Sequence, residues 1–331
     1  MITIHQMQEI IQSAYHKNPK QNLGFKGIPG LGKTEGIEQV VETMRKQYPD
    51  FFCLTRILSQ MAPEDFGVPW ILNGKYTTLV HDSFIFHPEA RGFIFFDEAA
   101  NGSEDTKKSV QNILSSRRLY DQAIPDGVMI LVASNNKEDR AGAGAFNTAF
   151  ANRIEWHEVE PDFQGWYKWA INAGLDFSIT SFLKKFQNKL FDFKPNREVN
   201  ATGRTWAKAN DVLNDPNEFP RLAGLIGEGI ATEFTQYRSV FMEFPEFSDV
   251  ENMPEKAKVP SSKDAQYAFV YALIQQLKPT NWKAFVTYCG RMNKEYLTLF
   301  VTEALEHHPK LGLNRTPEYT KFIYENQKDL L

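Results

Sequence analysis

The sequence predicts an α/β fold: a domain built on a parallel sheet, followed by an all-helical region. Three observations lead to this prediction. A glycine-rich loop at residues 27–34 lies between a short extended run and a helical pattern. Two apolar runs, 92–96 and 128–133, end in polar side chains, as central strands of a parallel sheet often do. Beyond Pro161 the apolar spacing is helical almost throughout.

The first third of the chain alternates between helix and strand patterns. Residues 4–17 have helical apolar spacing, and residues 23–26 form the first extended run. After the glycine-rich loop, a helix is predicted up to about Pro49, and residues 51–57 are typical of a buried strand. Asn73-Gly74 lies between two apolar runs, so residues 70–80 are predicted to form a β-hairpin.

The glycine-rich loop fits the phosphate-binding pattern G-x-x-x-x-G-K-[ST] at every fixed position. Glycines let successive backbone N–H groups face a phosphate, and the following helix directs its positive end at the same point. The alternative is a Gly/Pro-rich turn before an ordinary helix. The pattern predicts a nucleotide-binding loop made of Gly27, Ile28, Pro29, Gly30, Leu31, Gly32, Lys33 and Thr34. Lys33 would reach the β and γ phosphates, and the Thr34 hydroxyl would ligate Mg²⁺.

Two carboxylates, Asp97 and Glu98, follow the apolar run 93–96. At the carboxyl edge of a central strand, the Asp of a phosphate-loop protein holds the Mg²⁺ shell and a neighbouring Glu can orient the attacking water. The alternative is a strand followed by an acidic helix cap. Asn135 ends the run 128–134 in the same way, where its amide would reach the γ-phosphate or the water, or would cap a turn.

The segments between and after these strands are predicted from their spacing and turn residues. A helix closes at Arg117-Arg118, residues 119–128 are predicted to form a second hairpin or turn, and 154–159 form the last strand. Residues 139–144 are predicted to be a flexible link. We expect a nucleotide-binding α/β domain over 1–160, a helical lid over 161–244 and a helical C-terminal extension over 245–331.

Three features of the helical region need interpretation. Lys184, Lys185 and Lys189 lie opposite an apolar face and are predicted to form a solvated surface. Residues 245–263 are rich in Pro, Glu, Ser and Lys, which predicts a linker. Residues 200–206 are typical of a helix start with Thr202 as a possible cap.

The bulk properties are those of a globular protein. The chain has 331 residues, of which 42% are hydrophobic and 24% charged, and its net charge is −4. Without a block of basic residues, we expect no nucleic-acid ligand. Cys53 and Cys289 are too few and too far apart for a disulfide framework or zinc site, and no run is long enough to span a bilayer. We therefore expect a soluble cytoplasmic protein without a membrane partner.

The ordered set of motifs resembles the AAA+ ATPases of the MoxR type, in particular the MoxR-like ATPases of phages and prophages. Two further stretches carry the resemblance: residues 56–69, Arg-Ile-Leu-Ser-Gln-Met-Ala-Pro-Glu-Asp-Phe-Gly-Val-Pro, and residues 133–142, Ala-Ser-Asn-Asn-Lys-Glu-Asp-Arg-Ala-Gly. It covers roughly residues 20–215. The resemblance implies an AAA+ αβα domain with a helical lid, ATP and Mg²⁺ as ligands, and an ATPase site at a subunit interface.

The resemblance also implies roles for single residues. Residues 27–34 would be Walker A, and Asp97 with Glu98 would be Walker B. Asn135 would be sensor 1, with Asn136 as a second candidate. Arg153 would be the arginine finger that reaches a neighbour's nucleotide, and Arg204 would be sensor 2 on the lid. Arg153 could instead form an ion pair at a strand edge, and Arg204 a salt bridge within the lid.

The sequence departs from the family pattern at two positions. Gly203 stands where relatives often have Pro, and Gly102 stands where many have Arg. A second arginine acting in trans from that loop is therefore in doubt, with Arg140 or Arg117 as possible substitutes.

The resemblance predicts an ATP hydrolase that forms a homo-oligomeric ring, most simply a hexamer, and remodels a partner protein. Its hairpins would face the pore or the partner, which could carry a von Willebrand A-type or metallopeptidase-like domain. Two alternatives stay open. One is a nucleic-acid-remodelling ATPase of the same superfamily, whose turnover DNA would stimulate. The other is a nucleotide-gated assembly switch with little turnover.

Overall fold

The computed structural model describes residues 1–135 and 146–326, and these residues form two compact units. The first unit comprises Met1–Gly165 and Phe193–Arg204, and the second comprises Trp166–Asp192 and the residues from Thr205 onward. Among the described residues, no helix combines the length and apolar character needed to cross a membrane. Each unit is described by itself below.

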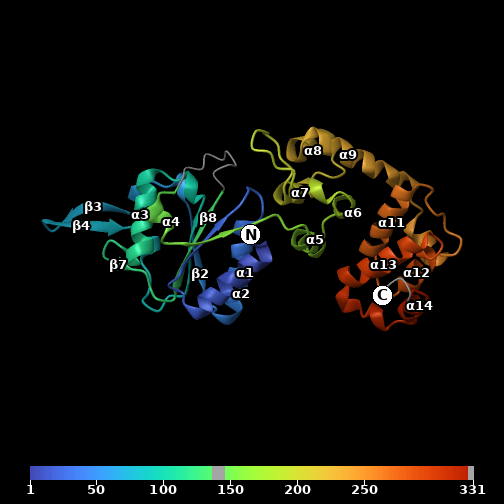
Figure 1. Cartoon of the computed structure of the whole chain (residues 1–331), viewed down its shortest axis with the longest axis horizontal. Coiled ribbons are helices and arrows are strands. Elements are labelled where there is room, and N and C mark those ends of the chain that lie inside the picture. Colours follow the sequence, from blue (N-terminus) through green and yellow to red (C-terminus); the bar gives the residue numbers. More distant parts are fainter. Residues whose placement is uncertain (136–145, 327–331) are drawn as a thin grey trace. The chain divides into compact units, whose positions relative to one another are not determined.

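A parallel sheet forms the centre of the first unit (Figure 1). Within the described residues its strands have the order β2-β5-β8-β1-β9, and every neighbouring pair is parallel. The strands are β1 (Asn22–Lys26), β2 (Phe52–Ile57), β5 (Gly92–Asp97), β8 (Val128–Ser134) and β9 (Glu155–Glu158). The predicted α/β fold with a parallel sheet is thereby confirmed. Because all the strands are parallel, their carboxyl ends meet at one edge of the sheet.

Helices cover both faces of this sheet (Figure 1). One face packs against α1 (Ile4–Lys17) and α2 (Lys33–Gln47), where the Tyr15 ring meets Phe93 edge-on. The other face packs against α3 (Glu104–Ser116) and α4 (Thr148–Ala151) in one hydrophobic cluster with Ile94 and Phe96. Alternate residues of β5 therefore serve opposite faces, and every residue of β8 is buried. This double coverage explains why both strands appear in the sequence as continuous apolar runs.

Two small hairpins extend from this core. Strands β3 (Gly67–Leu72) and β4 (Lys75–Val80) pair in antiparallel register around Asn73-Gly74, which confirms the predicted hairpin. Both turn residues have positive φ, the backbone conformation that an Asn-Gly hairpin turn needs. The second hairpin is much shorter than the predicted range of 119–128, with β6 at Arg118–Leu119 and β7 at Gln122–Ala123.

The second unit is helical, as the apolar spacing predicts. Three of its helices matter for the contacts below: α6 (Phe177–Lys185), α11 (Lys263–Gln275) and α13 (Lys294–His307). The other α-helices of this region are α5 (Phe163–Asn172), α7 (Gly203–Asn210), α8 (Glu218–Ile226), α9 (Glu228–Ser239), α10 (Phe247–Asn252), α12 (Trp282–Cys289) and α14 (Pro317–Asn326). Helix α7 begins directly after Thr202, where the sequence predicts a helix start.

The predicted linker over 245–263 is a packed segment instead. It contains helix α10, and its apolar residues Val250 and Ala257 are buried. The Arg291 guanidinium donates hydrogen bonds to the carbonyl oxygens of Pro254 and Ala257, each at 2.7 Å. The polar composition is misleading here because a few apolar anchors and one arginine hold the segment.

The predicted solvated lysine face is also wrong, because each lysine pairs with a carboxylate from another helix. Lys184 Nζ lies 2.9 Å from Glu303, Lys185 Nζ 2.6 Å from Asp264, and Lys189 Nζ 2.8 Å from Glu233. The first pair is the most buried, with exposed side-chain fractions of 19% and 8%. These ion pairs fasten the α6 region to α9, α11 and α13, which span residues on both sides of 244.

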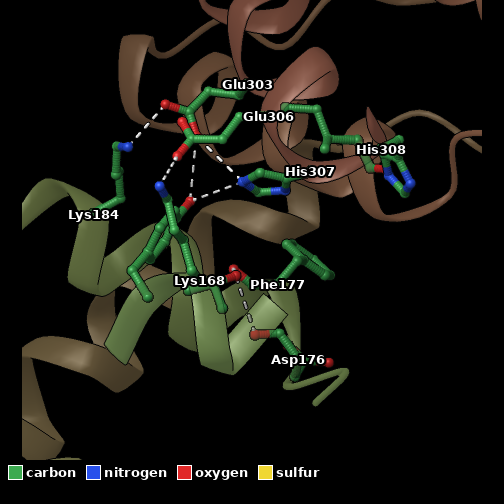
Figure 2. Close-up of polar contacts among 11 residues, drawn as sticks. Lys168, Asp176, Phe177, Lys184, Glu303, Glu306, His307 and His308 are labelled. Carbon is green, nitrogen blue, oxygen red and sulfur yellow. Dashed lines mark hydrogen bonds and ion pairs between the residues drawn. The ribbon is translucent and has the colours of Figure 1, made fainter. Parts of the chain in front are cut away.

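Glu303 is the centre of a buried polar cluster (Figure 2). Besides Lys184, it contacts His307 Nε2 at 3.3 Å and accepts a hydrogen bond from the Tyr167 hydroxyl at 3.4 Å. Burial by itself would raise the pKa of Glu303, but the hydrogen bonds from His307 and Lys184 outweigh it and lower the pKa. A carboxylate with a lowered pKa stabilises the fold above its unfolded pKa, and this stability is lost as the pH falls through the folded value.

We expect Glu303→Gln to lower the free energy of unfolding by about 3 kcal/mol, because it leaves a mostly buried lysine without its counter-charge. Glu306→Gln is the matched control: Glu306 lies one turn further along α13, and its pair with Lys168 is more exposed and 3.8 Å long (Figure 2). This control should cost less than about 1 kcal/mol. Urea unfolding at pH 7 measures both values, and equal losses would contradict a special role for Glu303. The difference in unfolding free energy between the two variants should narrow as the pH falls below 4.5, because Glu303 of the wild type then becomes protonated.

Candidate functional site

The glycine-rich loop joins β1 to α2, so the predicted order of strand, loop and helix is confirmed. Gly30 and Gly32 have φ values of 79° and 94°, in the left-handed region that side chains disfavour. Gly32 is the N-cap of α2, and Lys33 and Thr34 are its first two residues. The backbone amides and the positive end of α2 therefore lie together at the carboxyl edge of the sheet, which is a suitable place for a phosphate.

The Lys33 ammonium lies across its own loop. Its Nζ donates to the carbonyl oxygens of Gly27 at 2.8 Å and Ile28 at 3.1 Å, and it lies 3.5 Å from Asn135 Oδ1. Lys33 is only 8% exposed. The structure therefore brings Lys33 and Asn135 together, although 102 positions separate them in the chain.

Thr34 and Asp97 meet at the next position along the site. Thr34 Oγ1 donates to Asp97 Oδ2 at 2.7 Å, and the other Asp97 oxygen accepts from the Glu98 amide at 2.8 Å. A hydroxyl and a carboxylate oxygen are ligands that Mg²⁺ prefers, so the pair fits this ion. Among the described residues, no group of three or more His, Cys, Asp or Glu side chains could hold a metal.

Glu98 has a positive φ of 51°, which is uncommon for a residue with a side chain. This conformation turns the chain at the end of β5, directly after Asp97. The Glu98 carboxylate accepts a hydrogen bond from the Ser59 hydroxyl. Strand β2 ends at Ile57, so Ser59 lies beside the carboxyl end of the neighbouring strand. The carboxylate is thus held by a hydroxyl to which the sequence assigns no role.

Arg153 lies far from these groups. The register of β9 with β1 pairs Glu155 with Leu23, which places Arg153 level with Gln21, before the start of β1. It is therefore about 20 Å from the phosphate loop, at 3.3 Å per strand residue. Its guanidinium donates to Ser115 Oγ and to the Ala149 carbonyl oxygen, and Asn22 Nδ2 binds its main-chain oxygen at 2.9 Å. Arg153 does not join the site of its own chain.

The sequence offers Arg117 and Arg140 as candidates for a second arginine acting in trans, and the structure describes only Arg117. The Arg117 guanidinium donates to the carbonyl oxygens of Pro125 and Val128, at 2.9 Å and 2.5 Å, and burial lowers its pKa. These contacts hold Arg117 at its own turn, and its role as a trans arginine stays a prediction. Arg140 and Asn136 lie outside the described residues.

Arg204 lies beside the phosphate loop. Its Nη2 lies 3.4 Å from Oε1 of Glu35, the residue that follows Thr34 in the chain. The side chains of Arg204 and Glu35 are each 51% exposed. Two residues earlier, Thr202 packs on Gly30: a Cβ on that glycine would lie 2.7 Å from Thr202 Oγ1. Residues 193–204 therefore belong to the first unit and bring the start of α7 to the loop.

Lys26, which ends β1, lies over two aromatic rings. Its Nζ lies 4.2 Å from the centre of a Trp156 ring and 5.4 Å from that of Phe146. Burial lowers the pKa of Lys26, and the nearby Glu158 opposes this change.

A cavity of about 1220 Å³ also exists in the first unit, lined by residues such as Tyr15, Tyr48 and Arg91. It opens at the amino ends of the strands, opposite the phosphate loop, and has no part in this site.

Three residues near the loop have no role predicted from the sequence at this site: Ser59, Glu35 and, beyond its possible role as a cap, Thr202. Ser59 falls within residues 56–69, so only that local resemblance pointed to the segment. Glu35 lies in the first turn of α2, where the helix dipole favours a glutamate. Its presence there is therefore explained by the helix alone, and the sequence does not indicate its contact with Arg204. Each contact joins segments that are remote in sequence.

Comparisons with known proteins give no close relative. No protein-family model matches the chain, and no curated protein matches it. Among solved structures, NtrX from Brucella abortus in complex with ADP is similar over 98% of this chain and 68% of its own, at 14% identity and a TM-score of 0.40. A candidate ATPase from Cytophaga hutchinsonii is similar over 92% and 83%, at 12% identity and a TM-score of 0.35. At these TM-scores the similarities carry no argument about this chain.

Proposed function

We propose that this chain is a Mg²⁺-dependent ATP hydrolase of the AAA+ class, which works as a ring, most simply a hexamer, and remodels a partner protein. One observation carries the proposal. The carboxyl ends of β1, β5 and β8 bring Lys33, Thr34 with Asp97, Glu98 and Asn135 to one edge of the sheet, and Lys33 contacts both its own loop and Asn135. These five groups are the ones that phosphoryl transfer would use, and their meeting at one edge of the sheet supports the proposal.

Each group has a distinct chemical task in this proposal. The loop amides and Lys33 bind the phosphates, for which Lys33 exchanges its carbonyl partners for phosphate oxygens. Thr34 and Asp97 would hold Mg²⁺, which would neutralise charge on the β and γ phosphates. Glu98 orients the attacking water and takes up its proton, while Asn135 fixes the γ-phosphate or that water. Glu98 must release the Ser59 hydroxyl or share it with the water.

The position of Arg153 supports the ring. Arg153 lies about 20 Å from the loop of its own chain, which fits the role in trans that the resemblance implies. A neighbour would then complete each site through head-to-tail contacts, which form a ring where the rotation between subunits closes. ATP binding and hydrolysis would change the subunit interface, which is how turnover becomes mechanical work.

The β3–β4 hairpin supports a role in contacting a partner protein. It exposes Trp70, Ile71, Leu72, Tyr76 and Leu79, with exposed fractions between 46% and 88%. Both faces of the hairpin contribute to this set, because Ile71 pairs with Tyr76 while Trp70 and Leu72 lie on the other face. Exposed apolar side chains in such a group are typical of interaction sites. We assign the hairpin to the partner or the pore, and the resemblance adds a von Willebrand A-type or metallopeptidase-like domain as the partner's class.

Replacing Lys33 tests the nucleotide site. Lys33→Ala removes the ammonium that balances the β and γ phosphates, and we expect ATP binding to fall by at least about 100-fold, as for a lost charge-assisted contact to phosphate. Isothermal titration with Mg-ATP measures this change. Lys26→Ala is the control, because Lys26 lies over Trp156 instead of the loop. If Lys33→Ala binds ATP as tightly as the wild type, the nucleotide site is not where we place it.

A further inference from the structure

We propose that Glu35 is a positioning residue that holds Arg204 beside the phosphate loop before ATP binds, and that Arg204 leaves Glu35 for the γ-phosphate when ATP binds. This inference rests on the proposed ATPase function and adds a regulatory contact to its site. The observation is the ion pair between Arg204 Nη2 and Glu35 Oε1 at 3.4 Å. Glu35 directly follows Thr34 and lies in the first turn of α2, the helix that begins at the phosphate loop.

The backbone around Arg204 is anchored on the loop. Thr202 is 6% exposed and packs on Gly30, whose missing side chain makes room for it. Arg204 is the second residue of α7 and the last residue of the first unit. Its side chain is half exposed, so it can change partners while Thr202 stays in place. Arg204 can thus exchange one anion for another without a large movement of the main chain.

The charges define the direction of the effect. A carboxylate beside the phosphate site repels ATP, and it also competes with the γ-phosphate for the same guanidinium. The Arg204–Glu35 ion pair is given by one Nη2–Oε1 distance of 3.4 Å, and a γ-phosphate carries more negative charge and can accept two parallel hydrogen bonds from a guanidinium. Glu35 therefore weakens ATP binding and holds the Arg204 side chain in place before ATP binds. ADP lacks the γ-phosphate, so Arg204 has less to gain by leaving Glu35, and ATP and ADP should differ in their response.

An alternative explanation makes Glu35 only a favourable residue in the first turn of α2. Glutamate at this place interacts well with the positive end of the helix, whatever Arg204 does. The two explanations predict opposite effects of Glu35→Gln on ATP affinity, and only the first predicts that the effect depends on Arg204. If Glu35 only stabilises the helix, Glu35→Gln loosens the phosphate loop and weakens ATP binding, and the effect does not depend on Arg204.

A double-mutant cycle separates these explanations. We would measure dissociation constants for Mg-ATP and Mg-ADP in the full chain carrying Glu98→Gln, so that ATP is not consumed. Glu35→Gln should tighten ATP binding about two- to fivefold, the range for a half-exposed ion pair, and ADP binding less. In an Arg204→Ala background the same change should have a smaller effect on ATP. Raising the salt from 50 mM to 500 mM should reduce the difference, because the pair is exposed.

Glu38→Gln is the matched control, since Glu38 is an exposed carboxylate one turn further along α2. It removes the same charge and should change ATP binding little. In the chain with Glu98 intact, Glu35→Gln should lower KM with kcat nearly unchanged. Weaker ATP binding, or an equal effect with and without Arg204, would overturn the inference while leaving the ATPase proposal standing. A wild-type chain that does not bind ATP would remove both.

Discussion

Glu98→Gln is expected to stop ATP turnover while ATP remains bound. The amide keeps the shape of the side chain but cannot take a proton from water, so turnover should fall by about 10²- to 10⁴-fold, as for the loss of a general base. Asp97, Thr34 and Lys33 are unchanged, so the dissociation constant for Mg-ATP should stay within a few fold of the wild type. Phosphate release measures turnover, and equilibrium titration measures binding.

Ser59 provides a control for the Glu98 experiment. Its hydroxyl donates to the Glu98 carboxylate, and Ser59→Ala removes this donor while leaving the carboxylate able to act as a base. Turnover should change far less in Ser59→Ala than in Glu98→Gln. Normal turnover in Glu98→Gln would exclude Glu98 as the group that orients water.

The same Glu98→Gln variant separates a motor from a switch. A motor needs repeated hydrolysis, so the variant should trap ATP and lose activity on the partner protein. If it traps ATP and supports full partner activity, turnover is not required and the chain is a nucleotide-gated assembly switch. Added DNA addresses the remaining alternative, because a nucleic-acid-remodelling ATPase should be stimulated by it in a strongly salt-dependent way.

The parts of the fold that were predictable are those encoded by neighbours in sequence. The phosphate loop needs glycines at positions with φ of 79° and 94°, and the sequence has glycine at both. Strands β5 and β8 are buried on both faces, so their apolar runs are continuous and easy to recognise. Asn73-Gly74 determines the hairpin turn by its local backbone preference. In each case the physical requirement falls on a few adjacent residues.

The parts that were not predictable depend on which remote segments meet. Ser59 and Glu98, and Glu35 and Arg204, are pairs whose members are 39 and 169 positions apart. Lys184 follows an ordinary pattern for a solvent-facing lysine, and only the position of α13 gives it a buried partner in Glu303. Residues 245–263 have the composition of a linker, yet Val250 and Ala257 are enough to pack them. Composition and periodicity report the local chain, whereas these contacts are decided by tertiary packing.

Arg153→Ala is expected to lower ATP turnover by about 10³- to 10⁵-fold, the range for arginine fingers that stabilise phosphoryl transfer. ATP binding should change much less, because the ground-state phosphates are held by the loop and Lys33. Arg153 also donates to Ser115 Oγ and the Ala149 carbonyl oxygen, so its loss could act through the local structure. Ser115→Ala is the matched control: it removes one of these hydrogen bonds and keeps the guanidinium, and it should retain most of the activity.

Mixing two inactive variants shows whether Arg153 acts on a neighbour. Lys33→Ala lacks a working loop but keeps Arg153, and Arg153→Ala has the opposite defect. In a head-to-tail ring each interface takes the loop from one subunit and the arginine from its neighbour. In a random equimolar mixture each of the two is intact with a probability of about one half, so about one interface in four has both. Turnover near one quarter of the wild-type rate is therefore expected in the mixture. If mixed rings form and stay inactive, then Arg153 does not complete a neighbour's site, and its position remote from its own loop would need another explanation.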